Sequence, residues 1–309
     1  MSCFLITGGT GMVGRALCRY LMDNGHKAIV LTRQQNKQPS TDGIQYTYWN
    51  VEDKQMDAAI LQQCDYIIHL AGASIAGRRW SSRYKKEIEN SRIQSSALLV
   101  DTLRSHPHRI KAIISASGIG WYGKDRIPGK AFTECDEAGE GFLSNVCRLW
   151  EAGISEAGKL GIPVVCLRIG MVLSNEEGLL SRLKKALQWG IVGIPGNGTQ
   201  IVSWIHIEDL CRMMVFAAQH IHVQGSMNGV ATMPVSIKEL SLQYARSRKK
   251  RFILLYVPGF LLRLLLGPMA NEALKSITVS NRLIKEKGFQ FKYAGIAAAM
   301  EALATDRSL

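Results

Sequence analysis

Near the N-terminus the chain contains glycines whose spacing suits one kind of ligand. Gly9, Gly11 and Gly14 form the pattern GxGxxG directly after the apolar residues 4–6. In dinucleotide-binding proteins such glycines make a tight turn, let the backbone approach a pyrophosphate and let helix pack against sheet. The first N–H groups of the following helix, expected at residues 12–24, face the phosphates. We therefore predict a dinucleotide site formed by Gly8, Gly9, Thr10, Gly11, Met12, Val13 and Gly14.

The end of the second apolar segment indicates which dinucleotide binds. Residues 26–33 are rich in β-formers, and the last of them, Arg33, lies where NAD enzymes usually carry an acidic residue for the ribose hydroxyls. Arg33 can pair with a 2′-phosphate, Thr32 can donate a hydrogen bond to it, and residues 34–41 contain no Asp or Glu. The sequence thus favours NADP over NAD, with a solvated arginine at a strand end as the alternative.

Length and composition predict a globular protein of the cytoplasm. The 309 residues are 47% apolar, enough for a large core in one extended domain or in a large and a small one. The seven cysteines show no CxxC or paired spacing, which is typical of a reducing compartment. Residues 1–14 are expected to form the first strand and turn and not a secretory leader.

The basic and apolar runs near the C-terminus do not indicate a macromolecular partner. The net charge is +13, yet the run at residues 246–251 is short and is expected to be the solvated end of a helix. The apolar run at residues 252–266 contains Pro258, Gly259 and Arg263 and is shorter than the ~20 residues of a membrane span. We predict a buried or groove-lining helix there, and neither a nucleic-acid nor a membrane partner. Anionic small molecules such as NADP account for only part of the charge.

The order of the expected elements predicts an α/β fold, a doubly wound parallel sheet. Further strands are expected at 44–49, 65–70, 110–117 and 163–167, and helices at 54–63, 82–105 and 142–160. The long loops 71–81 and 118–141 follow strands and should border the ligand crevice.

Beyond residue 173 the regular alternation ends. Residues 174–200 are expected to leave the sheet toward the substrate lobe, and a strand at 202–207 feeds a helix at 208–219. We predict a Rossmann domain at 1–224 and a smaller substrate-side lobe at 225–309.

Seven motifs in this order resemble those of a known superfamily. They are TGGTGMVG (7–14), HLAG (69–72), RW (79–80), NSR (90–92), SASGIGWYG (115–123), LRIGMVL (167–173) and WIHIED (204–209). The chain resembles the extended short-chain dehydrogenases/reductases, and more closely their atypical branch of nucleoside-diphosphate-sugar epimerases with a family-specific C-terminal domain. The resemblance implies a small-molecule substrate, sugar-nucleotide-like or other, and is compatible with a homodimer.

The resemblance also implies roles for residues that spacing alone does not assign. Leu70, Ala71 and Gly72 match the segment against the adenine half of the cofactor, where small side chains leave room for the ring. Glu87 and Arg92 match positions near the cofactor, and Val172 matches one at the nicotinamide end. The alternatives are that Glu87 and Arg92 lie on a polar helix face and that Val172 packs in the core.

The expected catalytic group departs from the superfamily pattern. Ser117 matches the serine that polarises a carbonyl or hydroxyl, but the positions of the Tyr-x-x-x-Lys pair hold Leu143 and Cys147, and Ser91 replaces an asparagine. Tyr122 is the nearest substitute for the proton relay. Its alternative role is an aromatic wall of the pocket.

Other reactive or aromatic side chains are expected to be structural. Trp80 and Trp121 suit packing, and His206 and Asp209 match a motif that pins a returning strand and helix. Cys147 lacks the His or Asp that would support a nucleophile.

Two functional hypotheses follow from these residues. One is an NADP-dependent epimerase or oxidoreductase that uses Ser117 and Tyr122 on a hydroxyl or carbonyl carbon. The other is a protein that binds or senses NADP(H) without turnover, which the missing Tyr-x-x-x-Lys pair favours.

Overall fold

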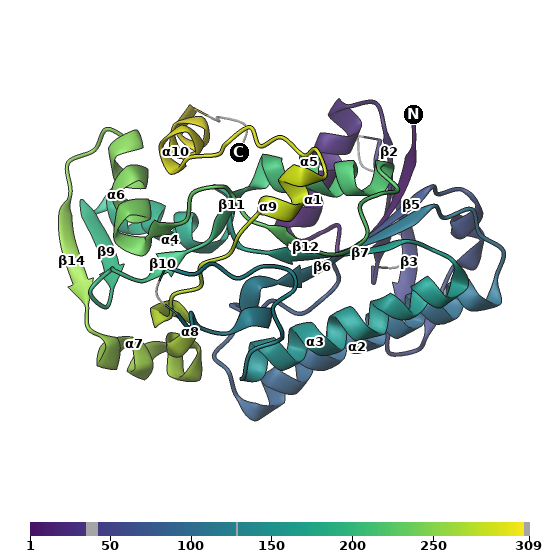
Figure 1. The fold of residues 1–309 in the computed structure, drawn as a ribbon, viewed down its shortest axis with the longest axis horizontal. Helices are drawn as coiled ribbons and strands as arrows, with labels where there is room; N and C mark the ends of the chain where they lie inside the picture. The colour runs from purple at the N-terminus through teal and green to yellow at the C-terminus, as the bar shows by residue number, and fades with distance from the viewer. Residues whose placement is uncertain (35–42, 128, 306–309) are drawn as a thin grey trace.

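The large part of the molecule is an eight-stranded sheet covered by helices on both faces (Figure 1). The computed structural model describes residues 1–34, 43–127 and 129–305. The strand order is β12-β7-β6-β5-β1-β2-β3-β4, parallel throughout except for the antiparallel pair β3–β4. The strands are β1 (Cys3–Thr7), β2 (Lys27–Thr32), β3 (Gln45–Asn50), β4 (Gln55–Met56), β5 (Tyr66–His69), β6 (Ala112–Gly118), β7 (Val164–Ile169) and β12 (Gly225–Gly229).

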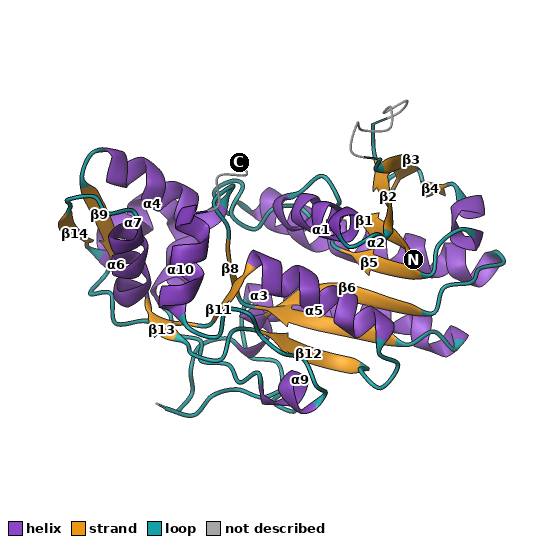
Figure 2. Cartoon of the chain, turned by 90° about the horizontal axis from the view of Figure 1, so that it is seen from above, coloured by secondary structure: helices purple, strands orange, loops and turns teal. Residues whose placement is uncertain are grey.

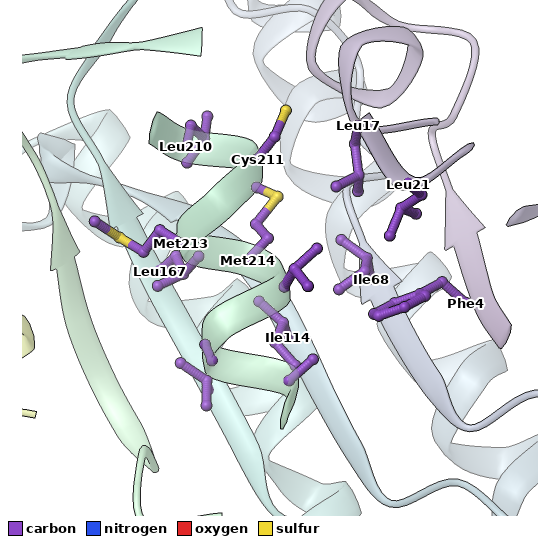
Figure 3. Packing of buried hydrophobic residues seen from close by; sticks show 14 of the residues in the cluster. Phe4, Leu17, Leu21, Ile68, Ile114, Leu167, Leu210, Cys211, Met213 and Met214 are labelled. Atoms are coloured by element: carbon purple, nitrogen blue, oxygen red, sulfur yellow. The ribbon is translucent and has the colours of Figure 1, made fainter. Parts of the chain in front are cut away.

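Helices α1 (Met12–Asp23) and α5 (Ile207–Gln219) cover one face of this sheet. Phe4, Ile68 and Ile114 from three neighbouring strands pack there against the two helices, which contribute Leu17 and Met214 (Figure 3). The long helices α2 (Ser82–Ser105) and α3 (Phe142–Ser155) lie side by side on the other face. Because both faces are covered, the central strands are apolar nearly throughout.

The second part of the chain forms a smaller lobe beside the sheet (Figure 2). Its own core joins α4, α6 and α10 with the strands between them. The lobe contains α4 (Gly178–Gln188), β9 (Ile191–Pro195), α6 (Ile237–Ser247), β14 (Ile253–Val257), α7 (Gly259–Leu266), α8 (Ala270–Leu274) and α10 (Ile296–Thr305). Strands β9 and β14 form a two-stranded parallel sheet.

Short elements link the two parts of the molecule. Strand β8 (Met171–Leu173) pairs with β11 (Trp204–His206), and β10 (Ile201–Val202) pairs with β13 (Val235–Ser236). Helix α9 (Arg282–Glu286) returns from the lobe to pack near β12. The remaining short 3₁₀ turns are η1 (Ala58–Gln62), η2 (Ile119–Tyr122), η3 (Glu156–Leu160) and η4 (Gly267–Met269).

The predicted fold class is confirmed, and α2 has the predicted bounds. The prediction of one helix at 54–63 is wrong, because the segment forms strand β4 and the 3₁₀ turn η1. Asp57 caps the N-terminus of η1 by accepting a hydrogen bond from the N–H of Ala59. The segment 225–229 belongs to the large sheet, although the sequence assigned it to the small lobe, because its pairing with β7 and the burial of Met227 outweigh its glycine-rich composition.

The apolar run at 252–266 also differs from the expectation. It forms strand β14 and helix α7 instead of one buried or groove-lining helix, and no residue of α7 is buried. Pro258 starts α7, because its missing N–H and fixed φ suit a helix start and interrupt a strand. Within the described ranges, no helix is long and apolar enough to cross a membrane.

Candidate functional site

The glycine turn lies where β1 meets α1, and each glycine there has a different steric reason. A Cβ on Gly14 would come within 2.3 Å of the carbonyl oxygen of Gly8, and one on Gly9 within 2.7 Å of Val30. Gly8 has φ +68° and lies against the carbonyl of Leu70. At Gly11 the nearest atom would be 3.4 Å away, so the protein itself leaves space there.

The open space at Gly11 leads to the N-terminus of α1. Gly11 is the N-cap residue of this helix and brings no side chain to accept its first N–H groups. Among the described residues, no side chain caps this end of the helix by a hydrogen bond. Unpaired N–H groups and the positive end of the helix dipole attract a phosphate, so the turn fits a dinucleotide pyrophosphate.

The neighbouring strands end at the same edge of the sheet. Thr7 lies opposite Leu31 of β2 and His69 of β5, and its Oγ1 accepts hydrogen bonds from the N–H groups of Leu70 and Ala71, both at 3.1 Å. The peptides expected at the adenine therefore lie beside the end of β1, where the glycine turn begins, and their contact with a cofactor stays a prediction. Burial lowers the pKa of His69 to about 3, so the imidazole that bonds to Thr7 is neutral.

Arg33 and Thr32 lie at the end of β2. The side chain of Arg33 is exposed, whereas Thr32 is buried and its Oγ1 accepts a hydrogen bond of 3.2 Å from the N–H of Gln34. The acid-free segment that follows Arg33 lies mostly outside the described residues, which resume at residue 43.

The buried side chain of Arg92 bonds to the loop after β5. Its Nη1 donates to the carbonyl oxygens of Ala73 and Ile88, and its guanidinium lies 4.7 Å from the ring centroid of Trp150. A Cβ on Gly72 would come within 2.9 Å of this guanidinium. Burial lowers the pKa of Arg92 to about 10. The arginine therefore positions the 70–73 segment and lies beneath its surface.

Glu87 and Val172 lie in two different environments. Glu87 is exposed on α2, with Arg78 at 3.9 Å. Val172 is partly buried in β8 opposite Ile205 and packs against the large core. The sequence analysis placed Glu87 near the cofactor and Val172 at its nicotinamide end, and both roles stay predictions.

The hydroxyl of Ser117 points into a buried ionic network. Its Oγ donates a 2.6 Å hydrogen bond to Glu151 of α3. The same carboxylate accepts two hydrogen bonds of 3.0 Å from Arg168 of β7 and one from Ser226 of β12. The sequence analysis expected this hydroxyl to face a substrate, whereas the structure holds it in the interior against Glu151.

Tyr122 belongs to the same network. Its OH donates to Asn228 at 2.7 Å and accepts from Arg168 at 3.1 Å, and the ring stacks on Phe132. Burial raises the pKa of Tyr122 to about 12, although Arg168 and Asn228 act in the opposite direction. A buried phenol with that pKa is a poor base at neutral pH, so the geometry favours a structural role over the expected proton relay.

Two glycines face the helix positions where the superfamily carries its Tyr-x-x-x-Lys pair. A Cβ on Gly120 would meet the Cβ of Leu143 at 3.1 Å, and one on Gly118 would lie 3.7 Å from the Sγ of Cys147. Burial raises the pKa of Cys147, whose Sγ donates a hydrogen bond to the carbonyl oxygen of Gly118. This side of the site therefore presents glycines, an aliphatic side chain and a protonated thiol.

The residues expected to be structural have interior partners. Asp209 accepts hydrogen bonds from the N–H groups of Lys292 and Tyr293, which fastens the segment before α10, and His206 caps α5. The indole N–H groups of Trp80 and Trp121 donate to backbone carbonyl oxygens. In the described part of the chain no group of three or more His, Cys, Asp or Glu could hold a metal ion.

The pairing of Arg168 with Glu151 was not predicted from the sequence. The available signal was a charged residue inside the apolar strand 164–169, since an arginine in a buried strand requires an anion. Sequence spacing does not identify the partner, because Glu151 lies on a helix of a different layer.

Comparison with known proteins agrees with this geometry. Residues 4–228 match the NAD dependent epimerase/dehydratase family, which covers most of the chain. The chain belongs to this family. Residues 257–303 of this epimerase family member match a domain of unknown function (DUF1731). The resemblance drawn from the motifs is thereby confirmed.

Relatives of this epimerase family member align along its whole length. An epimerase family protein of Mycobacterium leprae is 31% identical over 97% of this chain and 95% of its own. The crystal structure of human epimerase family protein SDR39U1 with NADPH has a TM-score of 0.85 at 27% identity, covering 98% of this chain and 99% of that one. A nucleoside-diphosphate sugar epimerase from Corynebacterium glutamicum has a TM-score of 0.76 at 30% identity, covering 98% of this chain and 58% of that one.

Replacing Gly11 by valine should abolish dinucleotide binding without unfolding the protein. The branched side chain would fill the space that the turn leaves for a pyrophosphate, while the protein atoms around Gly11 tolerate a Cβ. We expect the Kd for NADPH, measured by calorimetry, to rise by roughly 100-fold, or about 2.7 kcal/mol. In contrast, Gly14→Val should disrupt the turn itself, since its Cβ would collide with backbone. Unchanged NADPH affinity in a folded Gly11→Val protein would refute the site.

Replacing Tyr122 by phenylalanine should destabilise the fold. The change leaves the buried Oδ1 of Asn228 without its donor, at a cost of about 1–3 kcal/mol in the free energy of unfolding. Urea denaturation followed by circular dichroism measures this loss. The control is Tyr66→Phe, whose hydroxyl forms no hydrogen bond with a described residue and whose loss should cost less than about 0.5 kcal/mol. Equal stability of the two variants would remove the structural role.

Proposed function

We propose that the protein binds NADP(H) at the glycine turn and uses it in an oxidoreductase or epimerase reaction on a small substrate. The observation that carries the proposal is the space at Gly11 beside the N-terminus of α1, with Arg33 exposed at the end of β2. The pyrophosphate would lie on residues 8–14, and Arg33 would pair with the 2′-phosphate that distinguishes NADP from NAD. The NADPH in the human relative's crystal structure supports this choice.

The proposed substrate carries a hydroxyl or carbonyl carbon, as a nucleotide-linked sugar does. When bound, NADP(H) supplies the hydride chemistry. In this proposal the glycine turn would hold the cofactor, loops 71–81 and 118–141 would border the substrate, and the small lobe would form one wall of the site. The nucleoside-diphosphate sugar epimerase among its structural relatives supports this substrate class.

In this proposal Ser117 and Tyr122 are positioning residues. Through Glu151, Arg168 and Asn228 they hold the end of β6 and the turn η2 in place beside the cofactor site. Neither hydroxyl reaches the crevice without breaking a buried hydrogen bond. Because Leu143 and a protonated Cys147 occupy the positions of the usual proton relay, the proton must be exchanged with solvent or substrate, and turnover should be slow.

A second candidate function is NADP(H) binding without turnover. The observation in its favour is the absence of a titratable base at Gly118, Gly120 and Leu143. Such a protein would use cofactor occupancy as a signal or as a structural ligand. The two candidates share the cofactor site and differ only in whether substrate is turned over.

Replacing Arg33 by aspartate should reverse or abolish the preference for NADPH over NADH. A charged hydrogen bond to the 2′-phosphate is worth about 1.5–3 kcal/mol, roughly ten- to a hundredfold in Kd. Calorimetric titration with both cofactors measures the preference. Lys54→Asp, an exposed charge reversal after β3, is the matched control and should change neither affinity. Equal affinities of the unmodified protein for the two cofactors would contradict the NADP assignment.

A screen of nucleotide sugars and small carbonyl compounds separates the two candidates. NADPH consumption or epimerised product is the readout, and we expect slow turnover that survives Cys147→Ser. If Ser117 and Tyr122 are positioning residues, Ser117→Ala and Tyr122→Phe should lower stability and kcat together. A variant of wild-type stability that loses all activity would instead restore the proton-relay role. No turnover across the screen, with tight NADPH binding, would favour the non-catalytic candidate.

A further inference from the structure

Strand β14 and helix α7, which are consecutive in the chain, expose many large apolar side chains. We call this set the apolar edge, and its members are Ile253, Leu254, Leu255, Tyr256, Phe260, Leu261, Leu264 and Leu265. Ile253 and Leu264 are each 68% exposed, and Phe260 is 72% exposed. In monomeric proteins a contiguous apolar surface of this kind usually marks an interaction site.

The geometry of these two elements explains the exposure. β14 pairs with β9 and with no other described strand. Ile253 and Leu255 on one face are 68% and 53% exposed, and Leu254 and Tyr256 on the other are 37% and 43% exposed. α7 has no buried residue. Both elements lie at the end of the molecule formed by the small lobe, away from the large sheet (Figure 1).

The chain segment that carries the apolar edge has charges of a single sign. From Leu240 to Asn271 the chain contains no Asp or Glu and six Lys or Arg, five in the run 246–251 and one, Arg263, in α7. Arg246, Lys249, Lys250 and Arg251 are exposed, and none of them forms an ion pair with a described acidic residue. This run joins α6 to β14, so it lies at the start of the apolar edge.

An exposed tryptophan lies at the same place. Trp189 is 84% exposed, and the carbonyl oxygen of the next residue, Gly190, accepts a hydrogen bond of 2.9 Å from the N–H of Ile253. Trp189 therefore lies where the basic run meets β14. Tryptophan beside basic residues is typical of protein surfaces at a membrane–water interface.

The single sign of the charge distinguishes between two possible occupants of this surface, a second copy of the chain and a lipid bilayer. A two-fold contact with a second copy would bring the same acid-free segment together from both chains, with no carboxylate in it to compensate the positive charges. An anionic lipid surface offers both an apolar layer and compensating charge. We propose that the apolar edge and the basic run dock this protein onto an anionic lipid bilayer.

In this arrangement the protein lies on the bilayer and does not span it. The side chains of α7 and β14 enter the boundary between headgroups and acyl chains, while Lys249, Lys250 and Arg251 remain among the phosphates. The proposal departs from the expectation that the chain has no membrane partner. That expectation rested on the length of the apolar run, which bears on spanning and not on docking.

Vesicle sedimentation of the full chain tests the proposal. We expect it to bind vesicles of phosphatidylcholine mixed with phosphatidylglycerol, to bind phosphatidylcholine alone weakly, and to be released by high salt. Combined Lys249→Glu, Lys250→Glu and Arg251→Glu should lower the partition coefficient about tenfold or more. Combined Phe260→Asp and Leu264→Asp should lower it similarly.

A matched triple variant controls for net charge. Lys27→Glu, Lys54→Glu and Lys285→Glu reverse three exposed lysines of the sheet domain and α9 and should leave much more vesicle binding than the first triple variant. Circular dichroism melting checks that every variant is folded. Equal losses in the two triple variants, or no binding to anionic vesicles, would overturn the proposal. So would self-association in sedimentation equilibrium that Phe260→Asp with Leu264→Asp abolishes, because a second copy would then occupy the surface. None of these results depends on cofactor binding or turnover.

Discussion

Arg168 lies near the carboxyl end of the buried strand β7, and its charge requires an anion, which a helix of another layer supplies. Glu151 of α3 provides it through two hydrogen bonds of 3.0 Å, and both side chains are almost fully buried. Removing one partner of such a pair typically costs about 3–5 kcal/mol, because the other charge stays buried without compensation. The helix on one face of the sheet is thus tied to a particular strand in a particular register.

The rest of the site depends on this ion pair. Ser117 at the end of β6 and Ser226 of β12 bond to the carboxylate, while Tyr122 in η2 bonds to the guanidinium. The network therefore joins three adjacent strands, a helix and the first turn of the loop that borders the crevice. It fixes the backbone near the proposed cofactor site. The hydroxyls of Ser117 and Tyr122 are buried in this network and are therefore not available to a ligand.

The two ends of the molecule differ in which groups they leave exposed to a ligand. At the edge of the large sheet, Thr7 joins the ends of β1 and β5 through hydrogen bonds, and the turn at Gly11 leaves space beside α1. In the small lobe, β14 and α7 leave their apolar side chains in water, with positive charges beside them. The first arrangement is suited to a small anionic ligand held by backbone N–H groups, and the second to a large surface.

The sequence by itself determined the features that depend on neighbouring residues. The glycine turn, the helix after it and the alternation of strands and helices follow from local sterics and periodicity, so they were predicted almost as the structure has them. Tertiary structure decided what depends on contacts between distant residues. Ser117 points inward because Glu151 and Arg168 lie there, and Gly225–Gly229 is a strand because β7 pairs with it. Most large apolar side chains of β14 and α7 are exposed because no described element covers them. A pattern of residue types indicates which side chains favour burial. Which residues contact each of these side chains is decided only when the chain folds.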